Sequence, residues 1–273
     1  MKRASRTPAL PLVLLAIFLF MALPALLAFA GADVPESSRS IEAYQRESAM
    51  VDALLKEHDA APDTRIFILV TKEPAELSAW AEQDDGRYAQ LKSWPICMIG
   101  EGGLGPKMME GDEISPEGFY AVTADVMNPL STRHLSFNIG YPNNHDQLNG
   151  YTGSYIMVHG ECSSKGCFAM TDGVMDQIWA LMKRAFDDGQ TSVPVHIYPF
   201  AMTKENMAAH KGDPAFGFWK TLQPGWVFFD ATKRVPNMIV RKKAYVLGKS
   251  LDKAPVQTAG DAALQDKVLA NRR

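Results

Sequence analysis

A histidine and a cysteine occur close together in a segment whose pattern suits nucleophilic catalysis. Residues 155–172 begin with a short apolar run, typical of a buried strand, and end in a Gly-Cys turn before a polar helix start. His159 leaves the predicted strand, and Cys167 follows the turn. Cysteine chemistry requires a thiolate, a base that generates it and a backbone that exposes the sulfur. The segment therefore predicts Cys167 as a nucleophile and His159 as its base.

Several simpler interpretations compete with catalysis. Cys167 could be an inert buried thiol, and His159 taken alone would be a core histidine at a strand end. A zinc site is a further alternative, with ligands drawn from His159, Cys162, Cys167 and one of His145, Asp146 and His196. The chain has three cysteines, so any disulfide leaves one free thiol. Cys162 could pair in a disulfide or be a second redox-sensitive thiol.

The same segment resembles the YkuD-type L,D-transpeptidase family, and in particular its YafK-like murein L,D-transpeptidase subgroup. Members of the family carry a His-Gly strand end followed by Ser/Thr-His-Gly-Cys. His159-Gly160 and Ser164-Lys165-Gly166-Cys167 occupy those places, followed by the Phe-Ala-Met-Thr-Asp of the subgroup. Ser115-Pro116-Glu117-Gly118 is similar to the Thr-Pro-x-Gly turn of the family. The resemblance extends from about residue 65 to about residue 238.

The resemblance implies roles for residues around the proposed pair. The Gly160 carbonyl would orient the His159 ring, and backbone amides near Gly166 and Cys167 would form an oxyanion hole. Ser164, Lys165 and Gly166 are the expected turn residues, and Lys165 is also expected to favour the thiolate through its positive charge. The candidate substrate-binding residues are His134, Asn138, Tyr141 and Tyr155. No cofactor or metal is expected.

By this resemblance, Cys167 forms a thioester with a peptidoglycan stem peptide and passes the acyl group to an amine. An amidase that cleaves peptidoglycan cross-links, or the link to a peptidoglycan-bound lipoprotein, would use the same pair. A non-catalytic peptidoglycan-binding protein is the alternative from a different class. Lys165 and Ala169 depart from the histidine and arginine usual in the family, and the separation of His159 from Cys167 is shorter than usual. These departures change the charge around the acyl site.

The first 32 residues have the pattern of an export signal. Three cations at Lys2, Arg3 and Arg6 precede an apolar run over 10–27, and small-x-small sites follow at 28–30 and 30–32. An uncleaved anchor is the alternative, which would be the protein's contact with a membrane. The predicted location is the periplasm or cell envelope. A formal net charge of −3 gives no argument for nucleic acid as a partner.

Many short strands with helices inserted late indicate a β-rich α+β domain. The resemblance implies a YkuD-like sandwich with an inserted helix and a helical C-terminal extension. The expected division is a signal peptide at 1–32, an N-terminal helix at 33–62, a catalytic domain at 63–200, a packed extension at 201–247 and a polar tail at 248–273.

Sequence pattern also predicts the individual elements. Helices are expected at 36–58, 172–189, 205–211 and 215–222, with a short helix or turn at 73–80. Strands are expected at 66–70, 87–91, 95–99, 119–122, 134–142, 155–159 and 193–198. Residues 100–111 are expected to form a glycine-rich loop on the active-site side, and 143–153 a polar loop.

Overall fold

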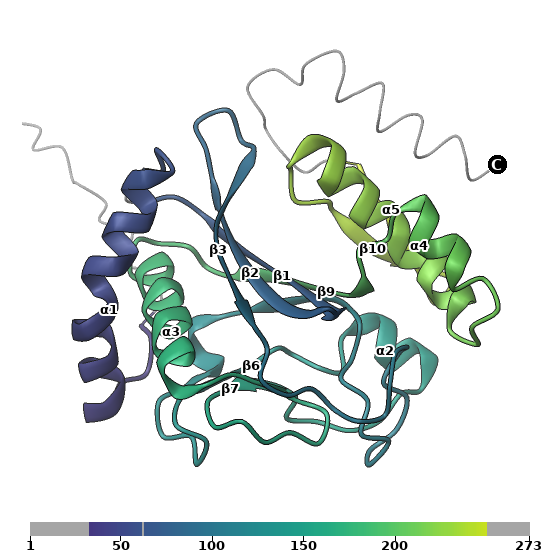
Figure 1. Cartoon of the computed structure of the whole chain (residues 1–273), viewed down its shortest axis with the longest axis horizontal. Helices are drawn as coiled ribbons and strands as arrows, with labels where there is room; N and C mark the ends of the chain where they lie inside the picture. Colours follow the sequence, from purple (N-terminus) through teal and green to yellow (C-terminus); the bar gives the residue numbers. More distant parts are fainter. Residues whose placement is uncertain (1–32, 62, 250–273) are drawn as a thin grey trace, which may run out of the picture.

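The computed structural model describes residues 33–61 and 63–249 (Figure 1). The predicted signal segment and nearly all of the predicted polar tail lie outside these ranges. A five-stranded sheet forms the centre, in the order β3-β2-β1-β9-β4. Its strands are β1 (Ile66–Glu73), β2 (Ala75–Glu82), β3 (Tyr88–Pro95), β4 (Gly118–Val122) and β9 (Val193–Phe200). Only the β1–β9 pairing is parallel within this sheet.

The short helix or turn expected at 73–80 is wrong, because β2 occupies this stretch. Its glutamates and alanines suggested a helix. However, Leu77, Ala79 and Ala81 alternate along the strand and are fully buried, which is the two-residue period of a sheet. The strand expected at 87–91 is confirmed and continues as β3 to Pro95, whereas the separate strand expected at 95–99 is wrong. Residues beyond it contribute one isolated bridge, between Met98 and Ala169.

A second, four-stranded sheet lies against the first and carries the Cys-His segment. It consists of β5 (Met127–Asn128), β6 (Ser136–Asn138), β7 (Met157–His159) and β8 (Phe168–Ala169), after a 3-10 turn at Ala124–Val126. The expected polar loop at 143–153 contains a helix, α2 (Asn144–Asn149). Asn143 and Asp146 form a capping box that stabilises this single short helix, and composition alone did not predict it.

Two long helices, α1 (Ser38–Glu57) and α3 (Asp172–Asp187), pack side by side on the same side of the central sheet as the second sheet (Figure 1). Both were predicted within a few residues. Ser37 caps α1 through a capping box with Ser40. The apolar face predicted for α3 contributes Ile178 and Leu181 to the main core. Because α3 begins at Asp172, soon after β8 ends at Ala169, its polar first turn lies next to the end of β8.

The opposite face of the central sheet is covered by the C-terminal extension. It comprises α4 (Lys204–Ala209), α5 (Phe216–Thr232) and the hairpin of β10 (Met238–Arg241) and β11 (Ala244–Leu247). Trp219 and Phe229 of α5 join Phe67 and Tyr198 of the sheet in a second, aromatic core. The helix runs ten residues beyond the predicted end at 222, and the hairpin was not predicted. The fold class, a β-rich α+β sandwich with an inserted helix and this extension, is confirmed.

Within the described ranges, no helix is both long enough and apolar enough to cross a bilayer.

Candidate active site

The pairing of β7 with β8 determines how His159 and Cys167 lie. The strands are parallel, with Val158 opposite Phe168 and His159 opposite Ala169. One step earlier in this register, Met157 lies opposite Cys167, and its amide donates to Cys167 Sγ at 3.4 Å. Alternate residues of a strand share a face, and directly paired residues face the same side. His159 and Cys167 are therefore diagonal neighbours on one face of the second sheet.

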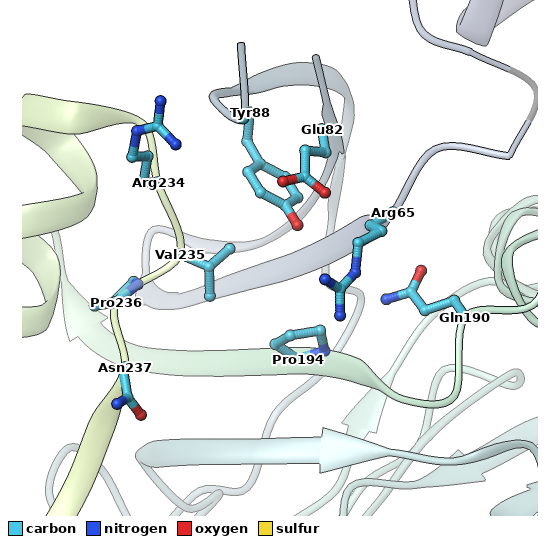
Figure 2. Close-up of a pocket in the computed structure, with 10 residues that line it drawn as sticks. Arg65, Glu82, Tyr88, Gln190, Pro194, Arg234, Val235, Pro236 and Asn237 are labelled. Carbon is cyan, nitrogen blue, oxygen red and sulfur yellow. The ribbon is translucent and has the colours of Figure 1, made fainter. Parts of the chain in front are cut away.

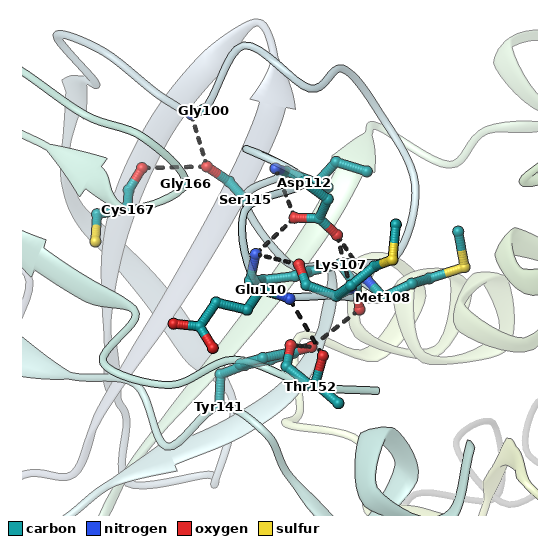
Figure 3. A network of polar contacts seen from close by, with 12 residues as sticks. Gly100, Lys107, Met108, Glu110, Asp112, Ser115, Tyr141, Thr152, Gly166 and Cys167 are labelled. Atoms are coloured by element: carbon teal, nitrogen blue, oxygen red, sulfur yellow. Dashed lines mark hydrogen bonds and ion pairs between the residues drawn. The ribbon is translucent and has the colours of Figure 1, made fainter. Parts of the chain in front are cut away.

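Two hydroxyl groups hold the backbone of Cys167. Its carbonyl oxygen accepts from Ser115 Oγ at 3.1 Å and from Ser164 Oγ at 2.8 Å. Ser115 is fully buried and itself accepts from the Gly100 amide at 2.9 Å, as Figure 3 shows. The Gly166 amide donates to Ser164 Oγ at 3.2 Å, and Gly166 has a φ of 120°, which favours glycine. The turn that presents the cysteine is thus fixed from both sides.

A disulfide between Cys97 and Cys162 lies beside the turn. The segment after β3 runs along β8, where the Cys97 amide donates to the Ala169 carbonyl at 2.8 Å. The disulfide consequently joins this segment to the loop that precedes the Gly166-Cys167 turn. Cys167 is a free, half-buried thiol. Because Cys162 is bonded to Cys97, it has no thiolate. Cys162 therefore cannot act as a nucleophile in place of Cys167, and it cannot be a ligand of the alternative zinc site.

The His159 ring is oriented by its own neighbour. Nδ1 lies 2.5 Å from the Gly160 carbonyl oxygen, so Nδ1 carries the proton and Nε2 is left as the basic nitrogen. Burial, the largest cause, lowers the pKa of His159 below 6.5, so the ring is neutral at pH 7. A Cβ at Gly160 would lie 2.7 Å from both Asp172 Oδ1 and His134 Cβ. Glycine is thus the residue that this close approach admits.

The thiol of Cys167 is also in its neutral form. Burial, the largest cause, raises the pKa of Cys167 above 9.0, while the Met157 amide and the charges of Lys107 and Arg133 oppose the shift. Lys165 is exposed, and its expected contribution to the thiolate stays a prediction. Both shifts therefore favour the neutral forms of the pair, a thiol and an uncharged imidazole.

The loop over residues 100–115 forms a wall of the site (Figure 3). Asp112 organises it, because its Oδ1 binds Lys107 Nζ at 2.5 Å and its Oδ2 accepts from the Met108 amide at 2.8 Å. The Thr152 amide donates to the Met108 carbonyl at 3.0 Å, which ties the loop to the segment before β7. The sequence placed this loop on the active-site side, but no motif singled out Lys107 or Asp112.

Comparison with known proteins identifies the family. The model of the YkuD family, described as the L,D-transpeptidase catalytic domain, matches residues 66–213, more than half of the chain. YafK of Escherichia coli (strain K12), named as an L,D-transpeptidase, is 41% identical over 192 residues, which cover 70% of this chain and 77% of YafK. The chain belongs to the YkuD L,D-transpeptidase family. This family acts on peptidoglycan.

Two solved structures also resemble this chain. The helical cell shape determining protein Pgp2 of Campylobacter jejuni matches with a TM-score of 0.41 and 20% identity, over 82% of this chain and 78% of that one. Bd1075 of Bdellovibrio bacteriovorus matches with a TM-score of 0.37 and 21% identity, over 62% and 61%. Membership of the family accordingly rests on the sequence matches.

Of the four predicted substrate contacts, Tyr155 touches Cys167 through its backbone, and Asn138 lies on β6, one strand further from Cys167 than β7. Tyr155 is 73% exposed, and its carbonyl accepts from Cys167 Sγ at 3.7 Å. Asn138 pairs with Met157 across β6 and β7, and its Oδ1 accepts from the Gly140 amide at 2.9 Å. Tyr155 thus has its backbone carbonyl at the sulfur and an exposed side chain, and its role as a substrate contact stays a prediction.

The other two predicted contacts, His134 and Tyr141, are held by the protein itself. His134 Nε2 lies 2.5 Å from Asp176 Oδ1, and the Asp176 carboxylate also pairs with Arg46 of α1 at 2.7 Å. The buried Tyr141 hydroxyl lies 3.1 Å from each of the Lys107 and Thr152 carbonyls. In this arrangement both side chains brace the elements around the site, and substrate contact by either one stays a prediction.

His145 and His196 are the other histidines that could serve as a base, and both lie in surroundings different from those of His159. His145 Nδ1 lies 3.1 Å from Asp146 Oδ1, and its ring stacks on Tyr245 at 4.2 Å between centroids. His196 is buried among aromatic rings, including Phe67 and Phe119 at 4.8 Å, and burial lowers its pKa to about 3. Neither residue belongs to the sheet that carries Cys167.

A cavity of about 300 Å³ lies elsewhere in the L,D-transpeptidase fold (Figure 2). Its lining comes from the start of β1, the end of β2, the stretch from the end of α3 into β9, and the segment after α5, and includes Arg65, Gln190 and Arg234. None of the residues predicted to act in catalysis lines it. This cavity is therefore not the candidate active site, which is the face of the second sheet beside β7 and β8, at His159 and Cys167.

Proposed function

We propose that this protein is an exported cysteine acyltransferase that forms a thioester between Cys167 and a peptidoglycan stem peptide, then passes the acyl group to an amine. The observation that supports the proposal is the register of β7 and β8, in which His159 lies opposite Ala169, two residues after Cys167, so that a shared face is expected. Family membership supplies the substrate class. The arrangement of the Gly160 carbonyl on Nδ1 supports the role of His159 as a base, because it leaves Nε2 unprotonated.

In the proposed reaction, His159 Nε2 takes the Sγ proton of Cys167 as the sulfur attacks an amide carbonyl carbon. The carbonyl C–N bond then breaks, and the proton held by His159 passes to the leaving amine. An acceptor amine attacks the thioester carbon and His159 takes its proton. The C–S bond then breaks as that proton passes from His159 to Sγ, which restores the thiol and the neutral imidazole. The two predicted donors to the oxyanion are the amides of Gly166 and Cys167. The Gly166 amide already donates to Ser164 Oγ, so the Cys167 amide is the candidate donor.

Mass spectrometry of purified sacculi incubated with the protein tests this function. New cross-links between stem peptides are the expected result, because the acyl group passes to an amine. Release of peptides without new cross-links would show that water is the acceptor, as in the amidase alternative. Sacculi that bind the protein but stay chemically unchanged would contradict catalysis and support a binding role.

The resting protonation states predict how Cys167 reactivity depends on pH. The pKa of the thiol is raised above 9.0 and that of His159 is lowered below 6.5, so both shifts favour neutral groups at pH 7. Alkylation of Cys167 by iodoacetamide should therefore rise about tenfold per pH unit from pH 7 to 9, in step with the thiolate fraction. Mass spectrometry of the peptide containing Cys167 measures the rate. A rate that is already constant at neutral pH would instead indicate a thiolate–imidazolium pair.

Export is the remaining part of the proposal. The cations, the apolar run and the small-residue sites of the first 32 residues motivate cleavage near Ala30 or Ala32. N-terminal sequencing of protein extracted from the cell envelope should begin just after one of these residues. A soluble cytoplasmic protein that retains Met1 would contradict this prediction.

A further inference from the structure

A buried ion pair lies beneath the glycine-rich wall of the site. Lys72 Nζ, near the end of β1, is 3.0 Å from Glu117 Oε1, just before β4, and neither side chain is exposed to solvent. Removing two charges from water is costly, and a buried pair often adds little net stability over an apolar one. What the pair does structurally therefore lies in the groups that it holds in place.

Lys72 uses its three N–H donors on three partners. Besides Glu117, Nζ donates to the carbonyls of Gly103 and Ser115, each at 2.9 Å. Glu117 Oε1 also accepts from the Gly105 amide at 2.6 Å. Gly103 and Gly105 lie in the first part of the wall and Ser115 at its end. The ion pair consequently fixes the loop at both ends.

The second oxygen of Glu117 connects the pair to the C-terminal extension. Oε2 accepts from Trp219 Nε1 of α5 at 2.7 Å. Trp219 is fully buried, and its ring packs edge-on against Phe200 at 5.2 Å and His210 at 5.7 Å. The indole N–H is thus held in one direction by the packing of the extension on the sheet.

Ser115 connects the pair to the nucleophile. The backbone carbonyl of Ser115 accepts from Lys72, and its side-chain Oγ donates to the Cys167 carbonyl at 3.1 Å (Figure 3). A continuous series of hydrogen bonds therefore runs from Trp219 through Glu117, Lys72 and Ser115 to Cys167. Every polar group in it is buried or half-buried, where such bonds are stronger than in water.

We propose that Lys72, Glu117 and Trp219 are positioning residues that act through Ser115 to hold the Cys167 backbone, so that the C-terminal extension controls the alignment of the nucleophile. The proposal rests on the function proposed above in taking Cys167 as the nucleophile. Alignment matters because a misplacement of about 1 Å in a catalytic group can cost roughly 10²-fold in rate. None of the three residues contacts the reacting atoms.

Trp219→Phe is the variant that tests the relay, because phenylalanine keeps an aromatic ring in the core and removes the N–H donor to Glu117, together with part of the buried indole volume. The expected result is a fall of about 10-fold in kcat with KM within about 2-fold, since alignment and not binding is lost. Alkylation of Cys167 by iodoacetamide should become faster, because a loosened turn exposes the thiol. Thermal unfolding measured in parallel shows that the variant is folded at the assay temperature.

Trp226→Phe is the matched control. Trp226 is half-buried on the same helix and packs edge-on against Tyr198 at 5.1 Å, whereas the hydrogen bond to Glu117 Oε2 comes from Trp219. This variant should keep the turnover and the alkylation rate of the wild type. Equal effects of the two substitutions on both rates would overturn the relay, because they would reflect general loosening of the extension.

A double-mutant cycle shows whether the effect passes through Ser115. Ser115→Ala removes the hydroxyl that reaches Cys167, so Trp219→Phe should add less than about 2-fold to the alkylation rate in that background. Full multiplication of the two effects would overturn the proposed route. Alkylation uses no peptidoglycan, so the double-mutant cycle tests the hydrogen-bond route even if the protein leaves sacculi unmodified. Unmodified sacculi would contradict only the proposed function.

Discussion

Cys167→Ser is expected to lower turnover of peptidoglycan by roughly 10³-fold or more, the scale seen when a catalytic nucleophile is removed. A hydroxyl is far less acidic than a thiol, so the neutral His159 ring would not generate its anion at a useful rate. Fold and stability should change little, because the side chain is small and half-buried. Cross-link formation on purified sacculi measures the loss, with thermal unfolding as the check on folding.

The double variant Cys97→Ser, Cys162→Ser is the matched control. It removes the disulfide that joins the segment after β3 to the loop before the nucleophile, so it should lower thermal stability. Most turnover should remain at temperatures where the variant is folded, since neither sulfur takes part in the proposed reaction. Full activity of Cys167→Ser, or loss of activity in the folded double variant only, would show that the nucleophile has been misassigned.

His159→Ala should slow acylation of Cys167 by about 10²–10⁴-fold, the usual contribution of a general base. The loss follows from the geometry, because Gly160 fixes the ring through Nδ1 and Nε2 is the only nitrogen left to accept the thiol proton. Pre-steady-state measurement of thioester formation on a soluble muropeptide isolates this step from the second transfer. The structure around β7 should survive the substitution, since the backbone pairing of the strand is unchanged.

His196→Phe provides a control for the loss of a buried histidine. His196 of β9 packs against the rings of Phe67 of β1 and Phe119 of β4, and phenylalanine suits those surroundings. Acylation should stay close to the wild-type rate. Normal acylation by His159→Ala, together with a large loss in His196→Phe or His145→Asn, would assign the base to one of these other histidines.

The chemistry-bearing segment could be predicted because its signals are local. The apolar run into His159, the glycine before Cys167 and the polar helix start after it each specify backbone geometry within a few residues. The helix after Thr171 followed from the spacing of its apolar face, and α3 begins there. The family resemblance then supplied the arrangement of the sheets, which local pattern does not.

The supporting residues of the site could not be predicted, because they depend on contacts between distant segments. Ser115 reaches Cys167 across 52 positions, and Trp219 reaches Glu117 across 102. Lys107 affects the pKa of Cys167 only because the wall folds back beside it. A lysine and a glutamate in a sequence usually indicate exposed surface, so nothing marked Lys72 and Glu117 as a buried pair. The strand β2 was missed for a related reason, since its glutamates and alanines favour a helix when its partner strand is ignored.

Intact-mass analysis of the protein during turnover of a stem-peptide substrate tests the central claim most directly. The account predicts a covalent acyl adduct of the wild-type chain, mapped by peptide digestion to Cys167 and removed by hydroxylamine as a thioester would be. Cys167→Ser should carry no such thioester adduct under the same conditions. An adduct mapped to any other residue, or turnover by the wild type with no adduct under rapid acid quenching, would contradict the proposed mechanism.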